Sequence, residues 1–137
     1  MPTTSPNYML IFRESTPERY ATMSADERRE RLRDWNAWCD RLAAEGTLLS
    51  GHPLEDAGRV VSAGRGKGAM DGPFAEAKEL IGGFFIIRAE SFDEAEAIAR
   101  QSPNLQYGMT VEVRPVAQAC HLARSLGMTS MREAAAV

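Results

Sequence analysis

The chain has 137 residues, of which 44% are hydrophobic and 26% are charged, values typical of one globular domain that needs no disulfide or metal to build its core. Its formal net charge of −3 is mild, and the arginines of residues 28–33 alternate with acidic residues around an expected helix, which excludes a sustained basic surface for nucleic acid. No stretch approaches the length of about 18 apolar residues that a membrane helix needs, and no export signal begins the chain, so we expect a cytoplasmic protein.

Apolar runs and helix caps predict the element order β-α-β-β-β-α-β. Both helices begin at a capping box, Ser24 to Glu27 and Ser91 to Glu94, and continue with apolar residues at spacings of three and four. Residues 83–89 are almost all apolar, which is typical of a strand covered on both faces. Pro115 is expected to end the last strand. In chain order, we expect strands at residues 7–12, 47–50, 59–63, 83–89 and 110–115, and helices at residues 24–45 and 91–102.

This order predicts an α+β protein with a ferredoxin-like antiparallel sheet, one added hairpin strand, and helices on one face only. A lone sheet cannot leave a large apolar patch in water, so we expect a homodimer whose sheets pack face to face. Residues 1–116 would form this domain. In residues 117–137, apolar residues at helical spacing predict an extra C-terminal helix, at least to Gly127, that packs on the domain or on its dimer partner.

Residues 70–87 place a polar turn directly before an apolar strand. The turn is Asp-Gly-Pro-Phe at residues 71–74, and Ala-Glu-Ala-Lys-Glu at 75–79 and Gly-Gly-Phe at 82–84 follow it. This stretch resembles the family of small bacterial proteins named for a DGPF motif, a branch of the YCII-related domains. The resemblance spans about residues 7–116 and implies the dimeric α/β-barrel type of the predicted fold.

The resemblance also bears on function. YCII-like relatives carry a His and an Asp, proposed as a catalytic pair, but Trp35 and Ala44 stand at the matching positions here. The barrel group implies an isomerase, lyase or dehydrohalogenase as one possibility. DGPF-type proteins are often encoded beside or fused to extracytoplasmic-function sigma factors, which implies a regulatory or interaction module as another.

Asp71 and His52 are the candidate acid–base residues. Asp71 is held at a turn beside an apolar strand, where the pKa of a carboxylate can rise, and Lys78 and Glu79 are close enough in sequence to fold back toward it. Alternatively, Asp71 only bonds the backbone of its turn, and Lys78 and Glu79 are solvated. His52 titrates near neutral pH and could move a proton or anchor a ligand, or it could simply be exposed.

Three further residues are candidates for ligand binding. Trp35 and Trp38 lie on the apolar stripe of the first helix, where they pack in the core or wall a pocket for a flat ligand. Arg88 could bind an anion or pair with a neighbouring carboxylate. Cys39 and Cys120 are expected to be free thiols, and no metal or cofactor motif is found. We therefore expect a small dimeric protein with a small-molecule pocket between sheet and helices, and whether it is an enzyme stays open.

Overall fold

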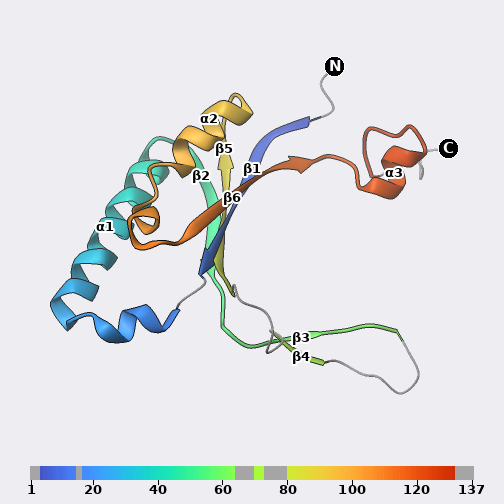
Figure 1. Ribbon diagram of the computed structural model, residues 1–137. Helices are drawn as coiled ribbons and strands as arrows, with labels where there is room; N and C mark the ends of the chain where they lie inside the picture. The colour runs from blue at the N-terminus through green and yellow to red at the C-terminus, as the bar shows by residue number, and fades with distance from the viewer. Residues whose placement is uncertain (1–3, 15–16, 64–69, 73–79, 132–137) are drawn as a thin grey trace.

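The computed structural model describes residues 4–14, 17–63, 70–72 and 80–131 (Figure 1). Within these ranges the strands are β1 (Thr4–Glu14), β2 (Leu48–Pro53), β3 (Gly58–Val60), β4 (Met70–Gly72), β5 (Leu80–Arg88) and β6 (Thr110–Ala117). The helices are α1 (Ala25–Ala44), α2 (Phe92–Ala99) and α3 (His121–Ser125), with short 3-10 helices η1 (Pro17–Thr22) and η2 (Pro103–Tyr107). None of the helices in these ranges is both long enough and apolar enough to cross a membrane.

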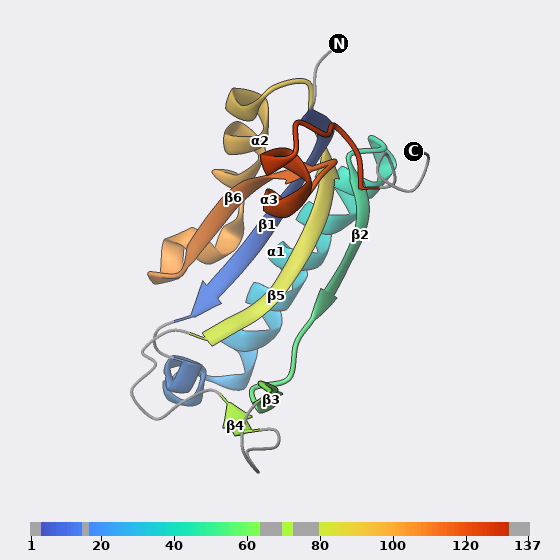
Figure 2. The same ribbon diagram turned by 90° about the vertical axis from the view of Figure 1, so that its right-hand side faces the viewer.

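Four strands form one antiparallel sheet in the order β2-β5-β1-β6, and α1 and α2 cover one of its faces. Figure 2 shows these strands side by side with α1 behind them. β1 lies in the middle of the sheet, and its register with β5 runs from Asn7 opposite Arg88 to Glu14 opposite Leu80. Because one helix connects β1 to β2 and another connects β5 to β6, the arrangement is ferredoxin-like. The predicted α+β fold is confirmed.

Both helices begin where the capping boxes predict. The Ser24 hydroxyl accepts a hydrogen bond from the Glu27 backbone N–H at 3.1 Å, and the Ser91 hydroxyl accepts one from the Glu94 backbone N–H at 3.1 Å. These bonds satisfy backbone donors that have no partner inside the helix. After α1, Gly46 has a φ of 75°, a left-handed conformation that glycine adopts at little cost.

The added hairpin is separate from the main sheet. β3 is shorter than predicted and pairs with β4, so that Arg59 lies opposite Asp71 in a two-stranded ribbon. The ribbon projects away from the sheet (Figure 1). All three β3 residues, including Val60, are exposed, because within the described residues β3 pairs only with β4 and joins no strand of the main sheet.

The C-terminal boundaries also differ from the prediction. β6 continues through Pro115 to Ala117, because β6 is an edge strand in which a proline can leave its missing N–H on the open side. The C-terminal helix predicted within residues 117–137 is α3, which begins only at His121. Leu122 of α3 is 72% exposed, and α3 lies beyond the end of β6, away from α1 and α2 (Figure 1). Its packing on a partner stays a prediction.

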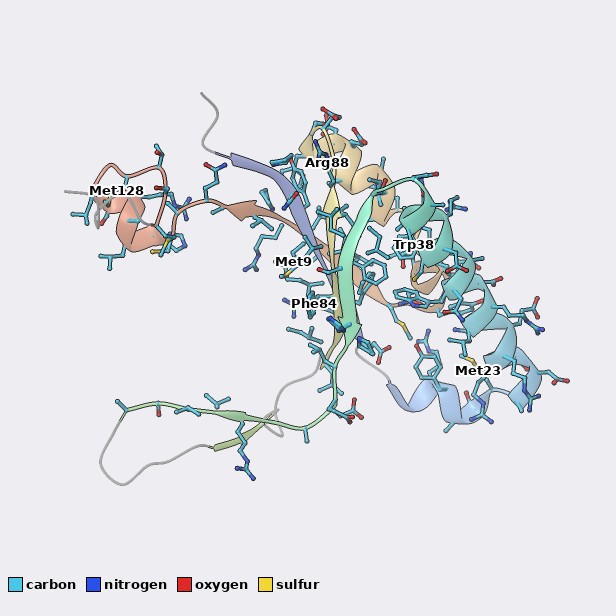
Figure 3. All side chains as sticks on the ribbon, turned by 180° about the vertical axis from the view of Figure 1, so that it is seen from behind. Met9, Met23, Trp38, Phe84, Arg88 and Met128 are labelled. Atoms are coloured by element: carbon cyan, nitrogen blue, oxygen red, sulfur yellow. The ribbon has the colours of Figure 1, made fainter. Side chains whose placement is uncertain are left out.

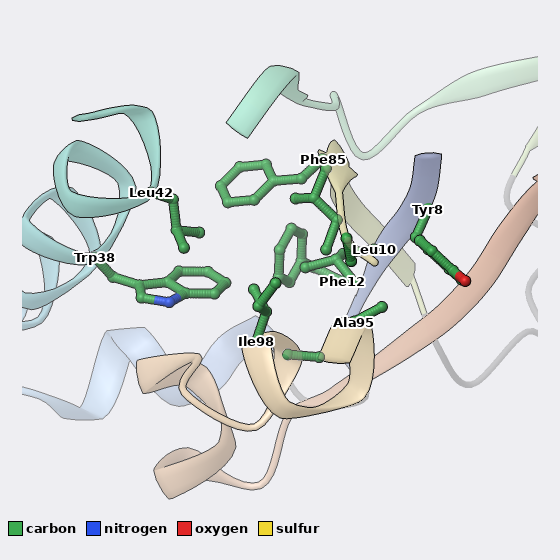
Figure 4. Packing of buried hydrophobic residues seen from close by; sticks show 11 residues of the cluster. Tyr8, Leu10, Phe12, Trp38, Leu42, Phe85, Ala95 and Ile98 are labelled. Carbon is green, nitrogen blue, oxygen red and sulfur yellow. The ribbon is translucent and has the colours of Figure 1, made fainter. Parts of the chain in front are cut away.

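The core lies between the sheet and the two long helices (Figure 4). Leu10 of β1, Ile87 of β5 and Leu42 of α1 are fully buried there. The Phe85 ring stacks on Trp38 with a centroid distance of 5.5 Å and meets the Phe12 ring edge-on at 4.9 Å. Such aromatic pairs add to the hydrophobic stabilisation that their buried area provides.

The opposite face of the sheet, here called the outer face, carries the alternate residues of the same strands. Met9, Phe84 and Ile86 are only partly buried there. Figure 3 shows Met9 and Phe84 on the side of the sheet away from Trp38. The central strands are thus apolar on both sides, as predicted for β5, but helices cover only one side.

Candidate functional site

A cavity of about 480 Å³ lies where α1 and η1 meet the ends of β1, β2 and β5. We call it the α1 cavity. One part of its wall is apolar and is formed by Phe12, Leu32 and Trp35, while Phe84, whose side chain lies on the outer face, borders the cavity at the sheet. The other part is formed by polar residues, namely Glu14, Tyr20, Arg28, Arg31, Asn36, His52 and Asn104. A few polar groups in a mostly apolar concavity of this size are typical of small-molecule sites.

Glu14 and Tyr20 form a hydrogen-bonded pair in the cavity wall. Glu14 ends β1, the chain turns through η1, and the Tyr20 hydroxyl donates to Glu14 Oε1 at 3.1 Å. Burial of the phenol and the nearby Glu14 carboxylate raise the pKa of Tyr20 to about 12. Tyr20 is therefore protonated at neutral pH and acts as a hydrogen-bond donor, which orients the carboxylate.

Arg28 and Arg31 bring positive charge to the cavity from one face of α1, since residues three apart on a helix are neighbours. The Arg31 guanidinium lies over the ring of Tyr107 in η2, a cation–π contact that fixes its position. Within the part of the chain that the structure describes, Arg31 Nη1 is buried and has no hydrogen-bond partner. A donor in this state favours a ligand that carries an acceptor oxygen.

Two adjacent glycines shape the opposite wall. A Cβ atom at Gly82 would lie 3.3 Å from Cδ of Glu14, so the glycine leaves the space that this carboxyl group occupies. A Cβ atom at Gly83 would lie 2.8 Å from the backbone oxygen of His52, so this glycine allows β2 to approach β5 closely. The Gly-Gly pair thus positions both Glu14 and the end of β2.

His52 and Trp35 are the two predicted site residues among those that line the cavity, and the His52 side chain lies on the outer face beside Phe84, its partner in the β2–β5 register. The His52 side chain is exposed, and its ring centroid is 6.0 Å from that of Phe84. Trp35 is half-buried, and its ring meets those of Phe12 and Trp38 at 5.0 and 5.4 Å. Trp35 therefore joins the cavity to the core.

The other predicted site residues lie elsewhere. Trp38 is 2% exposed and packs in the core, which is the first of the two roles expected for it. Arg88 is exposed at the far end of β5, and it is absent from the described cavity wall. The Asp71 backbone lies in β4 of the ribbon, but its side chain is outside the described part of the structure. Lys78 and Glu79 lie outside the described residues.

Sequence reasoning missed most of the polar wall. The one available signal was the spacing of Arg28, Arg31 and Trp35, which places all three on one side of a helix. Glu14, Tyr20 and Asn104 carry no motif, and only the folded chain brings them together. Among the described residues, no three His, Cys, Asp or Glu side chains are grouped so that they could hold a metal ion.

Comparisons with known proteins place the chain in a family. An uncharacterised protein of Rhizobium meliloti is 49% identical over 49 residues, a match that covers 35% of this chain and 40% of that protein. Among solved structures, the 5-chloro-2-hydroxyhydroquinone dehydrochlorinase of Burkholderia phenoliruptrix, in complex with 2,5-dihydroxybenzoquinone, matches with a TM-score of 0.49 and 18% identity. That match covers 82% of this chain and 95% of the dehydrochlorinase chain. The family model for the YCII-related domain matches residues 8–119, most of the sequence, and the chain therefore belongs to the YCII-related domain family.

Proposed function

We propose that this protein binds a flat small molecule with an anionic group in the α1 cavity. The observation that carries the proposal is the placement of Arg28 and Arg31 beside the aromatic side chains of Phe12 and Trp35. The rings offer faces for a planar ligand, and the guanidinium groups offer donors that match a carboxylate. Native mass spectrometry of the freshly purified protein would reveal a retained ligand.

The proposal is tested with benzoate and benzamide, which share a shape but differ in charge. Titration followed by tryptophan fluorescence should show tighter binding of benzoate, because a hydrogen bond to a charged group contributes about 1.5–3 kcal/mol, or roughly 10- to 100-fold in affinity. Arg31→Gln should abolish this preference. Arg33→Gln, an exposed arginine outside the described cavity wall, is the matched control. Equal affinities for the two compounds in the wild-type protein would contradict an anionic ligand.

An acid–base enzyme of the isomerase, lyase or dehydrohalogenase type is the second candidate. His52 is its candidate base, because this residue is among those that line the cavity of the proposed ligand site. His52→Gln should then abolish turnover of a substrate found by screening, while benzoate affinity changes little. His121→Gln, in exposed α3, is the matched control. Unchanged turnover in the His52 variant would contradict this role.

We also propose that a second copy of the chain covers the outer face. The support is the half-buried apolar group of Met9, Phe84 and Ile86, and the projection of α3 and the β3–β4 ribbon on this same side (Figures 1 and 3). Light scattering should report a dimer for the wild-type protein and a folded monomer for Ile86→Lys. Leu105→Lys changes an exposed leucine of η2 and should remain dimeric. A wild-type monomer at micromolar concentration would contradict the proposal.

A further inference from the structure

We infer that Glu14 is the hydrogen-bond acceptor through which the α1 cavity holds a protonated O–H or N–H group of its ligand, and that Tyr20 is its positioning residue. The inference rests on the proposed function, because it assigns a second contact of the same ligand site. A ligand that fits would carry its anionic group toward Arg28 and Arg31 and a donor group toward Glu14.

The Glu14 carboxylate is held in place and still has acceptor positions to offer. Its Oε1 accepts a hydrogen bond from the Tyr20 hydroxyl at 3.1 Å, which holds the group in one orientation. A carboxylate has two oxygens and about four acceptor positions, so this bond leaves acceptor capacity free for a ligand. The Tyr20 hydroxyl also lies 3.4 Å from Met109 Sδ, so the phenol is itself held in place.

Gly82 provides the space around the carboxylate. Glu14 Cδ lies where a side chain at Gly82 would come within 3.3 Å of it, and both residues line the cavity. Any larger residue at position 82 would have to displace the carboxyl group. The close approach of β2 to β5 explains only Gly83. Gly82 has a separate role, which is to leave room for the Glu14 carboxyl group.

Groups of both charges surround the acceptor, and the charges of Arg19 and Arg31 reach Tyr20, where they lower its pKa and so oppose part of its rise. Tyr20 faces the carboxylate from η1, Arg28 and Arg31 line the cavity from α1, and His52 lines it from β2. Glu14 is the one acidic residue in the described wall, and it therefore complements a donor while the arginines complement an anion. An acceptor and cationic donors in one wall would fix the orientation of a flat ligand that carries both a donor and an anionic group.

The test uses 4-nitrophenol, a flat phenol whose ionisation near neutral pH is followed directly by the absorbance of its phenolate. Bound beside the Glu14 carboxylate, the phenol should keep its proton to higher pH than in Glu14→Gln, because a nearby like charge disfavours the ionised form. We expect the pKa of the bound probe to fall by about 1 or more in Glu14→Gln, the range for one adjacent charge. Glu30→Gln removes an exposed charge from α1 and should leave that pKa unchanged.

Two further variants keep the result specific. Tyr20→Phe removes the positioning hydroxyl and should lower the pKa of the bound probe, by less than Glu14→Gln does. Gly82→Ala should also lower this pKa. Gly58→Ala, where a Cβ meets nothing within 4 Å, should leave it unchanged. Thermal melting confirms that each variant is folded.

The outcomes distinguish the ligand site as a whole from the role of Glu14 within it. Failure of the wild-type protein to bind either 4-nitrophenol or benzoate would overturn the proposed ligand site, and this inference with it. Binding of 4-nitrophenol with the same bound pKa in wild type, Glu14→Gln and Tyr20→Phe would overturn the role of Glu14 alone. An equal fall of that pKa in Glu30→Gln would also overturn it, because the effect would then come from overall charge.

Discussion

Replacing Gly83 with alanine should destabilise the protein, because the new Cβ atom would lie inside the contact distance of two backbone atoms of β2. The added methyl carbon would be 2.8 Å from the His52 carbonyl oxygen and 3.2 Å from the Pro53 Cα. Neither atom can rotate away as the end of a side chain could. β2 and β5 must therefore separate by several tenths of an ångström, which weakens their backbone pairing at His52 opposite Phe84 and Pro53 opposite Gly83.

The magnitude follows from two opposing effects. Forcing an extra methyl group into a packed interior costs roughly 1–3 kcal/mol. A glycine-to-alanine change also restricts the unfolded chain, which stabilises a protein by about 0.4–1 kcal/mol where the native conformation permits the new residue. Gly58→Ala isolates this second effect, because a Cβ at Gly58 meets nothing within 4 Å. Gly83→Ala should therefore be less stable than Gly58→Ala by at least about 1 kcal/mol.

Urea denaturation followed by circular dichroism measures both free energies of unfolding, provided that the two variants share one m-value. Equal stability of Gly83→Ala and Gly58→Ala would refute the reasoning, since it would mean that β2 does not approach β5 as closely as the structure shows. The same displacement changes the part of the α1 cavity wall that Pro53 and Gly83 form. Benzoate affinity should accordingly fall in Gly83→Ala and remain unchanged in Gly58→Ala.

Two further predictions concern the core and the outer face. Leu42→Ala should cost about 2–5 kcal/mol of unfolding free energy, because Leu42 is 1% exposed, whereas Leu32→Ala at 59% exposure should stay within about 0.5 kcal/mol; similar losses in urea denaturation would contradict the assigned core. On the outer face, hydrogen bonds from Arg13, at 2.6 Å, and from Arg114 hold the pKa of Glu112 below its usual value of 4.5. The stabilisation from this carboxylate should be present above pH 4.5 and be lost as pH falls through the lower pKa of the folded state. An NMR titration that gives Glu112 an ordinary or raised pKa would contradict this, and Glu112→Gln should remove its part of the acid sensitivity.

The sequence by itself determined the four strands of the main sheet and the starts of both long helices, but it missed β4, which overlaps the predicted polar turn. Ser24 and Ser91 were recognisable as caps because capping bonds join residues only three apart, so the chain carries that information locally. The apolar run of β5 likewise indicated a two-sided strand. These local signals sufficed for the α+β class, and they placed Trp35 and Trp38 on the apolar stripe of α1.

Only the tertiary structure decided which of these residues meet at a site. It separated Trp35, in the cavity wall, from Trp38, in the core, although both belong to the same apolar stripe. It also joined Glu14 and Tyr20 to Asn104, which lies far along the chain where no periodic pattern relates the positions. A cavity is the space left by elements that pack on one another, and its lining depends on strand register, helix placement and the close approach that Gly83 allows, none of which is a property of neighbouring residues.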